Sequence, residues 1–412
     1  MSNTINLKRE NMLKLIRETY FSRIATKPEL SKATGLTLPT IHNFINELLS
    51  HEIVKVHGSA DSQGGRRATL YEFNTSLFQI LAVRMTLTSI DIGLFDIGFH
   101  CLKEMQCKID FLNMTVDEGM QQIIFYVTEC LQTWNVERTS LLGIGTTFPG
   151  PVEPVSGIIR DLPNLRHWKS VPAKSMLERA LNIPVFVEKD SLSNVVGLKW
   201  LNPKDLSSNS NVVYVAIELG VGIGLLVNSQ LYRGENCMMG EIGHISIDPS
   251  GPLCNCGNRG CLELYASDIG ILQHIRDRVK DGQDPVIYSL CKGQLDQIDM
   301  PMVLHAEEMG DLIAREEMEF CLKYIAVCIV NIIKLYDPDK IILGHKWLNK
   351  YPDMFQRVLE NVFMNPLFAN RESVTIELNK IENLELKAAA AVPIDHQFSS
   401  VDNCAFLKLL NE

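Results

Sequence analysis

The side chains with the clearest chemical potential lie close together between Gly240 and Glu263. Four of them are good zinc ligands: His244, Cys254, Cys256 and Cys261. Three thiolates and one imidazole make a closed tetrahedral set, which is typical of a structural rather than a catalytic zinc site. Gly257 and Gly260 allow the backbone to turn tightly around an ion. The sequence therefore predicts one structural Zn2+ bound by this loop.

Unpaired thiols and a disulfide are the two alternatives to zinc. The chain has 11 cysteines, an odd number scattered along the sequence, and nothing else in it points to an oxidising compartment. We favour zinc because four suitable ligands lie so close together, and we interpret the remaining cysteines as small buried hydrophobic residues. The same loop carries Glu241 and Glu263, which together with His244 we expect to face a small polar ligand.

Length and composition describe an ordinary soluble globular chain. Its 412 residues allow two or three domains, and 46% of them are hydrophobic and 21% charged. No apolar run is long enough to cross a membrane, and the N-terminus lacks the apolar core of a signal peptide. We therefore expect a cytoplasmic protein with no membrane partner.

The net charge of −10 is unevenly distributed along the chain. Residues 1–74 contain ten Lys or Arg and seven Asp or Glu, a net charge of +3. The remaining residues carry 29 Lys or Arg against 42 Asp or Glu, a net charge of −13. A mildly basic segment on an acidic body is compatible with a DNA-binding module attached to another domain.

The first 50 residues have the pattern of short helices. Apolar residues recur at helical spacing over 7–20, and Thr26 followed by Glu29 predicts a capping box for a second helix that stops at Gly35. A third helix would bury Ile41, Phe44, Ile45, Leu48 and Leu49. Two short helices joined by a glycine turn are typical of a helix-turn-helix. Its candidate DNA contacts are Pro39, Thr40, His42, Asn43 and Asn46.

A hairpin is predicted next, with strands over 53–57 and 68–73. The segment between the strands ends in Gly64-Gly65-Arg66-Arg67, which predicts a wing whose Arg66 and Arg67 enter a narrow minor groove or bind phosphates. The alternative for residues 1–73 is a helical adaptor with a hairpin, in which the polar residues of the third helix form a solvated face. The local basic charge and the two arginines favour DNA binding.

From Phe78 onwards, predicted strands alternate with predicted helices. The clearest strands cover 80–83, 90–96, 141–146, 184–188, 212–217 and 340–344, and the helices cover about 116–134, 173–181, 306–336, 387–392 and 404–410. A polar segment at 201–210 interrupts this alternation and marks a candidate boundary between two lobes. The predicted fold class is α/β, with a winged helix-turn-helix over 1–75 and two lobes over 76–203 and 204–412. We expect the last helices to return to the first lobe or to the DNA-binding domain.

These patterns together resemble the ROK family of repressors and sugar kinases, and in particular its NagC, XylR and Mlc-type regulators. The wing with its Gly-Gly-Arg-Arg tip, the segment from Phe148 through Asn164 to Trp168, and the His/Cys loop carry the resemblance. It covers nearly the whole chain. The resemblance implies an actin-like two-lobe fold with a sugar in the cleft, and a homodimer or homotetramer.

The resemblance also implies a set of sugar-binding residues: Asn164, Asp190, Glu241, His244 and Glu263. Carboxylates and amides pair well with sugar hydroxyls, and such pairing discriminates strongly between ligands. In the family's kinases, the residue that matches Asp190 removes the proton from the accepting hydroxyl. We expect Asp190 to be a sugar ligand here, and the alternative is a carboxylate that caps the next helix.

Two departures separate this chain from the kinases that it resembles. Their phosphate-binding turn, Asp-x-Gly-Gly-Thr, is replaced by Arg84-Met85-Thr86-Leu87-Thr88, whose side chains block the close backbone approach that phosphates require. We therefore expect no ATP binding and no phosphoryl transfer. Lys189 stands where the kinases have Asn. It either binds an anionic group on the sugar or is an exposed lysine paired with Glu188 or Asp190.

The leading hypothesis is a sugar-responsive transcriptional regulator that represses genes of carbohydrate uptake or catabolism. Its partners would be a double-stranded DNA operator, a monosaccharide or sugar derivative, and further copies of the chain. The alternatives are an ATP-dependent sugar kinase with an accessory N-terminal domain, and a repressor controlled by a partner protein instead of a sugar.

Overall fold

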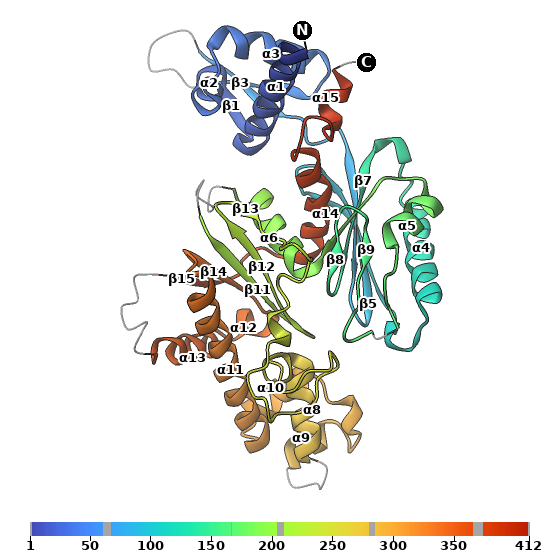
Figure 1. Cartoon of the computed structure of the whole chain (residues 1–412), viewed down its shortest axis with the longest axis vertical. Coiled ribbons are helices and arrows are strands. Elements are labelled where there is room, and N and C mark those ends of the chain that lie inside the picture. The colour runs from blue at the N-terminus through green and yellow to red at the C-terminus, as the bar shows by residue number, and fades with distance from the viewer. Residues whose placement is uncertain are drawn as a thin grey trace. The chain divides into compact units, whose positions relative to one another are not determined.

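The computed structural model describes residues 2–60, 67–165, 167–203, 210–279, 285–365 and 374–410 (Figure 1). The chain divides into two compact units. Unit 1 comprises residues 1–161, 167–203 and 383–412, and unit 2 comprises residues 162–166 and 204–382. The C-terminal segment thus belongs to the same unit as the N-terminal helices.

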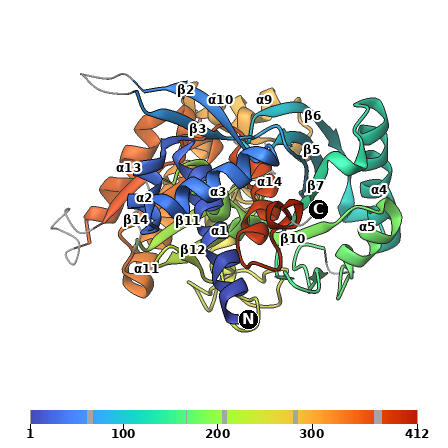
Figure 2. The ribbon, with the colours of Figure 1, turned by 90° about the horizontal axis from the view of Figure 1, so that it is seen from above.

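The N-terminal part of unit 1 is a group of three helices packed with a small antiparallel sheet of strand order β1-β3-β2. Figure 2 shows the β2–β3 hairpin extending beyond the helices. We call this part the head. Its elements are α1 (Ser2–Ser22), β1 (Ile24–Thr26), α2 (Lys27–Thr34), α3 (Leu38–Ser50), β2 (Val54–Ser59) and β3 (Thr69–Phe73).

Local sequence signals explain where the head helices begin and end. The predicted capping box is confirmed: the Thr26 hydroxyl accepts a hydrogen bond from the Glu29 amide, and the Glu29 carboxylate accepts one from the Thr26 amide. The hydrogen bonds that the Glu29 carboxylate accepts from the Thr26 amide and the Thr26 hydroxyl lower the pKa of Glu29. Gly35 ends α2 in the left-handed conformation, with φ +70°. Thr37 then caps α3 by accepting a hydrogen bond from the Thr40 amide.

The rest of unit 1 is built on a mixed sheet of strand order β10-β7-β4-β5-β6. β10, β7 and β4 run parallel, and β5 and β6 are antiparallel to their neighbours. Helices α6 and α14 pack together, and α14 also packs on the central strands. The elements are β4 (Gln79–Met85), β5 (Ser89–Asp96), β6 (Cys101–Lys108), α4 (Val116–Thr133), β7 (Leu141–Phe148), β8 (Val152–Glu153), β9 (Ile158–Ile159), α5 (Ala173–Leu181), β10 (Val185–Lys189), α6 (Asp190–Leu201), α14 (Leu384–Gln397) and α15 (Ala405–Leu409).

The prediction of a helix over 387–392 was too short. α14 begins at Leu384 and continues through Pro393 to Gln397. Proline has no N–H to donate to the Ala389 carbonyl in the turn before it. That carbonyl faces Gly145 of β7, where an added Cβ would lie only 1.9 Å from the Ala389 oxygen. The glycine therefore permits β7 and α14 to pack closely at the point where the proline interrupts the helical hydrogen bonding.

Unit 2 is built on a second mixed sheet of strand order β13-β12-β11-β14-β15, in which β11, β14 and β15 run parallel. Buried residues of the sheet join those of α8, α10, α11 and α13 in one apolar core. The elements are β11 (Val212–Ile217), β12 (Val221–Val227), β13 (Gln230–Leu231), the 3-10 turn η3 (Ile242–His244), α7 (Glu263–Ala266), α8 (Asp268–Val279), α9 (Pro285–Leu290), α10 (Met300–Glu308), α11 (Leu312–Tyr336), β14 (Lys340–Gly344), α12 (Lys346–Lys350), α13 (Pro352–Phe363) and β15 (Thr375–Leu378).

The single helix predicted over 306–336 was wrong. The structure has two helices there, α10 and α11, separated by Gly310 with φ +88°. Asp311 then caps α11, because its side chain accepts a hydrogen bond from the Ala314 amide. The apolar spacing continues across this break, which explains why periodicity alone missed it. In the described part of the chain, no helix is both long enough and apolar enough to cross a membrane.

Candidate functional site

The loop between β13 and α7 folds back on itself through short backbone contacts. The Cys254 amide donates to the Asn258 carbonyl, and the Gly257 amide donates to the Cys254 carbonyl, at 2.8 and 3.0 Å. Gly257 has φ +92°. Gly260 has φ +58°, and an added Cβ would lie 1.8 Å from the Asp248 carbonyl oxygen. Glycines at these two positions let the loop close, as the sequence predicted. We call residues 240–263 the metal loop.

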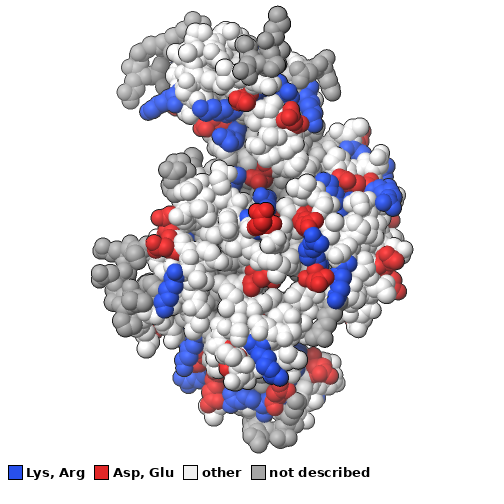
Figure 3. All heavy atoms as spheres, in the orientation of Figure 1, with Lys and Arg blue, Asp and Glu red and all other residues white. Residues whose placement is uncertain are grey.

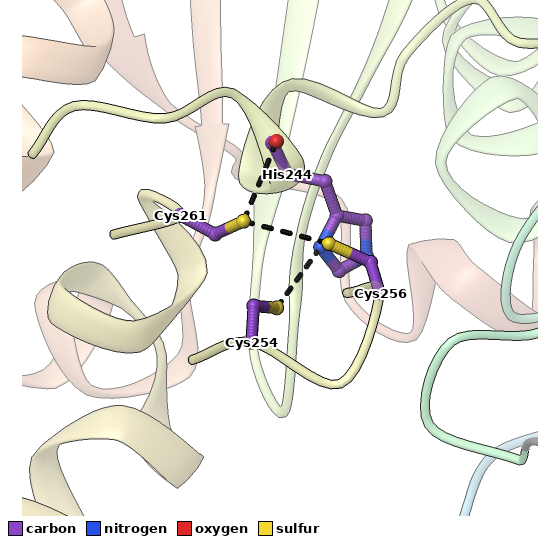
Figure 4. Close-up of side chains that lie close together, drawn as sticks. All are labelled: His244, Cys254, Cys256 and Cys261. Carbon is purple, nitrogen blue, oxygen red and sulfur yellow. Dashed lines mark hydrogen bonds between the residues drawn. The ribbon is translucent and has the colours of Figure 1, made fainter. Parts of the chain in front are cut away.

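The metal loop brings together the four predicted metal ligands, His244, Cys254, Cys256 and Cys261 (Figure 4). Their ligand atoms all lie within 4.8 Å of one another. The Cys254 sulfur is 3.6 Å from His244 Nδ1, and the Cys256 and Cys261 sulfurs are 3.5 Å apart. Zn–S bonds of about 2.3 Å in a tetrahedron separate the sulfurs by roughly 3.8 Å. The donor set and its spacing therefore fit a structural zinc ion.

Burial disfavours the ionised form of two thiols of this cluster, Cys254 and Cys261. Burial raises the pKa of the Cys261 thiol well above its usual range, and its hydrogen bonds with Cys256 and Cys254 raise it further. Burial also raises the pKa of Cys254. A bound divalent cation would reverse this preference, because it deprotonates the thiols that coordinate it. The remaining cysteines are only partly as expected: Cys101 is exposed, and Cys107 and Cys237 are partly exposed.

The second ring nitrogen of His244 points to a carboxylate. His244 Nε2 lies 3.8 Å from a Glu241 oxygen, whereas Nδ1 faces the Cys254 sulfur. A carboxylate behind a metal-binding histidine holds the ring orientation and selects the tautomer. In this arrangement one ring nitrogen of His244 faces the thiol cluster and the other faces a carboxylate.

A second polar cluster in unit 2 is centred on Glu263, the first residue of α7, whose side chain is largely buried. One Glu263 oxygen accepts from Asn164 Nδ2 at 3.3 Å, and the other accepts from the Val221 amide at 3.1 Å. At Gly220, an added Cβ would lie 2.6 Å from Glu263, so the glycine makes room for the carboxylate. The structure thus joins two predicted sugar ligands, Asn164 and Glu263.

Asn255 is a member of this cluster that the sequence prediction missed. Its Nδ2 donates to Asn164 Oδ1 at 3.0 Å. The available signal was its position between Cys254 and Cys256, which ties it to the metal loop. We call Asn164, Asn255 and Glu263 the amide–carboxylate cluster.

Lys189 and Asp190 belong to unit 1, where β10 ends and α6 begins. Asp190 Oδ1 accepts from the Ser191 amide at 2.6 Å, and its carbonyl accepts from the Ser193 hydroxyl. Lys189 is only 3% exposed, and neighbouring Glu188 is 1% exposed. The alternative of an exposed lysine is therefore wrong. The other predicted sugar ligands, Asn164, Glu241, His244 and Glu263, belong to unit 2.

The β4–β5 turn holds the residues at which the family resemblance places the phosphate-binding turn of the kinases. Thr86 Oγ1 accepts hydrogen bonds from the backbone amides of Thr88 and Ser89, at 3.2 and 2.9 Å. Leu87 is buried, and Arg84 pairs with Asp91 at 3.3 Å. The threonine side chain therefore takes two of the backbone donors that a glycine turn offers to a ligand.

The predicted DNA contacts on α3 share one solvent-accessible face. Pro39, His42, Asn43 and Asn46 are exposed, and the Thr40 hydroxyl contacts the Thr37 hydroxyl at the start of the helix. His42 lies 3.0 Å from the Lys27 ammonium and 3.1 Å from Asn46. Arg67 is exposed, and Arg66 lies outside the described residues. Among the described residues drawn in Figure 3, basic and acidic side chains are interspersed on the visible face.

Comparisons with known proteins agree with the fold and with the family resemblance. A xylose repressor from Caldicellulosiruptor bescii is 26% identical over 389 residues, covering 93% of this chain and 94% of the relative. A glucokinase from Thermotoga maritima is 28% identical over 264 residues, covering 63% of this chain and 82% of the relative. Regulators and kinases are thus both among its relatives.

A solved structure of a ROK family transcriptional regulator, described as a homologue of the E. coli MLC protein, has the same fold. It superposes with a TM-score of 0.77 at 22% identity and covers 99% of this chain and 100% of that one. The fold is therefore the actin-like α/β fold with mixed sheets. The sequence profile described as "ROK family" matches residues 80–383. The chain is a member of the ROK family.

Proposed function

We propose that this protein is a sugar-responsive DNA-binding repressor of carbohydrate uptake or catabolism genes, and that it acts in the cytoplasm as a homodimer or homotetramer. The observation that carries the proposal is a contrast within one chain. The backbone of the β4–β5 turn bonds to the hydroxyl of Thr86, whereas the amide–carboxylate cluster joins Asn164 to two polar residues of the metal loop. A chain that keeps sugar-binding side chains without a phosphate-binding turn is suited to sensing a sugar.

The head has the features of a winged helix-turn-helix. α2 and α3 are joined by a short turn at Gly35, α3 buries Ile41, Phe44, Ile45 and Leu48, and β2 and β3 form a hairpin. With one face of α3 buried, its exposed polar face is available for base edges in the major groove. Arg67, just before β3, and Arg66, which lies outside the described residues, are proposed to bind the phosphates or the minor groove.

The proposed sugar site draws on Asn164, Glu241, His244 and Glu263 of unit 2. The described hydrogen bonds use one lone pair on each Glu263 oxygen, and a carboxylate has about four acceptor positions. The site therefore retains capacity to accept hydrogen bonds from sugar hydroxyls. Asp190 and Lys189 of unit 1 are proposed as further sugar ligands. Burial of Lys189 supports a role for its ammonium inside the protein, where an anionic sugar would be a suitable partner.

Helix α6 offers a route from sugar to head within unit 1. It begins at Asp190, and near its end Trp200 is buried and stacks on Phe21 of α1 with ring centroids 4.8 Å apart. The indole nitrogen of Trp200 donates to Asp395 of α14 at 2.9 Å. The helix has 12 residues and is about 18 Å long. A shift of α6 caused by a sugar at Asp190 would therefore reach the first helix of the head.

A structural zinc ion on the metal loop would hold Glu241, His244 and the start of α7 in their relative positions. When bound, it would supply a closed tetrahedral centre and no reactive position. The other roles belong to side chains of the protein. The thiolates and the imidazole would bind the ion and so hold the loop together, Glu241 would orient the His244 ring, and Glu263 would bind the sugar. To act on the repressor, the effector must in addition bind two states of the protein differently.

Operator binding with and without sugars tests the proposal. A DNA duplex selected by the protein from a random-sequence pool should bind tightly, and one monosaccharide or sugar phosphate should change its affinity. The same samples with ATP should form no sugar phosphate. A protein that phosphorylates the sugar at a kinase-like rate would instead be an enzyme. The similarity to a glucokinase is the reason to test this alternative.

A further inference from the structure

Asn164 is held between two partners whose chemistry fixes the orientation of its amide. Its Nδ2 faces Glu263 at 3.3 Å, and its Oδ1 faces the Nδ2 of Asn255 at 3.0 Å. An ionised carboxylate only accepts hydrogen bonds, so the Asn164 nitrogen must be the atom that faces Glu263. The Asn164 oxygen must then face a donor, and the Asn255 side chain supplies one. The chain of bonds is consistent in only this orientation.

Asn255 reaches Asn164 from the centre of the metal loop. It lies between Cys254 and Cys256, and the backbone bonds of Cys254 with Asn258 and Gly257 close the turn around it. The sulfurs on either side of it belong to the four-ligand cluster. The position of Asn255 is therefore set by the residues that would hold the metal, although Asn255 itself is not a metal ligand.

We propose that Asn255 is a positioning residue that connects the metal loop to the sugar site by fixing the orientation of Asn164. The inference rests on the proposed sugar site and assigns to that site a residue outside the predicted ligand set. This hydrogen bond adds a second connection between the metal and the sugar, beside the ligands that the loop carries itself: the loop places Asn255, Asn255 orients Asn164, and Asn164 with Glu263 presents a defined pattern of donors and acceptors. A loop without metal would let Asn255 move and would release the Asn164 amide.

Asn255→Ala and Asn255→Asp test the link through sugar affinity. Loss of a neutral hydrogen bond in Asn255→Ala should weaken the binding of the effector sugar about three- to tenfold. Asn255→Asp should weaken it more, because the new carboxylate would face the Asn164 oxygen. Zinc content, measured by elemental analysis, should stay at the wild-type level in both variants. Asn258→Ala is the matched control, since Asn258 lies on the same loop and its described bonds go to His244 and Arg259.

Zinc release tests the same link without any sugar. A chelator and a coloured metal indicator report the release rate for wild type, Asn164→Ala, Asn255→Ala and the double variant. Asn164→Ala should speed release severalfold, although it lies outside the metal loop. The double variant should release zinc no faster than the faster single variant, because both changes remove the same bond.

Sugar binding by the wild-type protein tests the proposed sugar site, and zinc release from the variants tests the role of Asn255 separately. If wild type binds no sugar of the panel, the sugar site is wrong, and the zinc-release cycle still decides the role of Asn255. Unchanged zinc release in Asn164→Ala would overturn the link. So would an Asn255→Ala variant that matches Asn258→Ala in sugar affinity, or two release effects that multiply in the double variant.

Discussion

The β4–β5 turn and the amide–carboxylate cluster are both polar sites, and they differ in what their polar groups can still do. In the turn, Thr86 Oγ1 accepts from two backbone amides, and the next residue, Leu87, is buried. In the cluster, the described bonds of Glu263 leave acceptor capacity on both oxygens. In the turn, the Thr86 side chain accepts the hydrogen bonds of backbone amides that could otherwise bind a ligand. In the cluster, the Glu263 carboxylate is held by two amides and can still accept hydrogen bonds from a ligand. This difference is the physical basis on which we propose a sensor that does not catalyse.

The largest effect is expected from removing a metal ligand. Cys261→Ser should lose zinc and sugar binding and lower the melting temperature, because structural zinc contributes directly to folding energy. Operator binding should persist while the head stays folded. Elemental analysis, thermal unfolding and DNA binding check this. Cys237→Ser is the matched control, because Cys237 lies outside the four-ligand cluster, and it should retain zinc. A Cys261→Ser protein with full zinc content would refute the metal assignment.

The next largest effect is expected from Glu263→Gln. The new amide NH2 would face either Asn164 Nδ2 or the Val221 amide, so a donor would meet a donor. Loss of the charge and of one bond should weaken sugar binding about 10- to 100-fold, which corresponds to roughly 1.5–3 kcal/mol. Calorimetric titration measures the affinity. If Glu263→Gln binds the sugar with the wild-type affinity, the amide–carboxylate cluster is not the sugar site.

A smaller and more selective effect is expected from Trp200→Leu. The stacked contact with Phe21 and the hydrogen bond to Asp395 would be lost, while Asp190 at the other end of α6 is untouched. Sugar affinity and operator affinity should each change less than about threefold, but the effect of sugar on operator binding should fall. Trp134→Leu, at the end of α4, is the control substitution of another tryptophan. A Trp200→Leu protein with unchanged coupling would exclude α6 as the route.

The smallest effect is expected from Thr86→Gly in the β4–β5 turn. Two amides would lose their acceptor and a glycine would add freedom to the unfolded chain, so stability should fall by about 1–2 kcal/mol. Denaturant unfolding measures this. Sugar binding should remain at the wild-type level, because the turn is not part of the sugar site. A large loss of sugar affinity in this variant would show that the turn and the cluster act together.

Much of this architecture could be predicted from local sequence signals. The capping box at Thr26, the buried face of α3 and the clustering of the four candidate metal ligands follow from short-range spacing, and the structure has each of them except that Leu49 of α3 is only half-buried. What could not be predicted depends on distant partners or on breaks within periodic segments. The bond between Asn255 and Asn164 joins residues 91 positions apart. The break at Gly310 and the helical Pro393 depend on conformations that apolar spacing does not encode.

The central claim is that the protein senses a sugar without phosphorylating it. The most direct measurement is operator binding by fluorescence anisotropy, titrated with sugars in the absence of ATP, for wild type and Glu263→Gln. We expect one sugar to change the wild-type operator affinity at least about tenfold, which is within the range of ordinary allosteric coupling. Glu263→Gln should keep its operator affinity and lose the response. A response that requires ATP, or no response to any sugar, would contradict sugar sensing without phosphorylation.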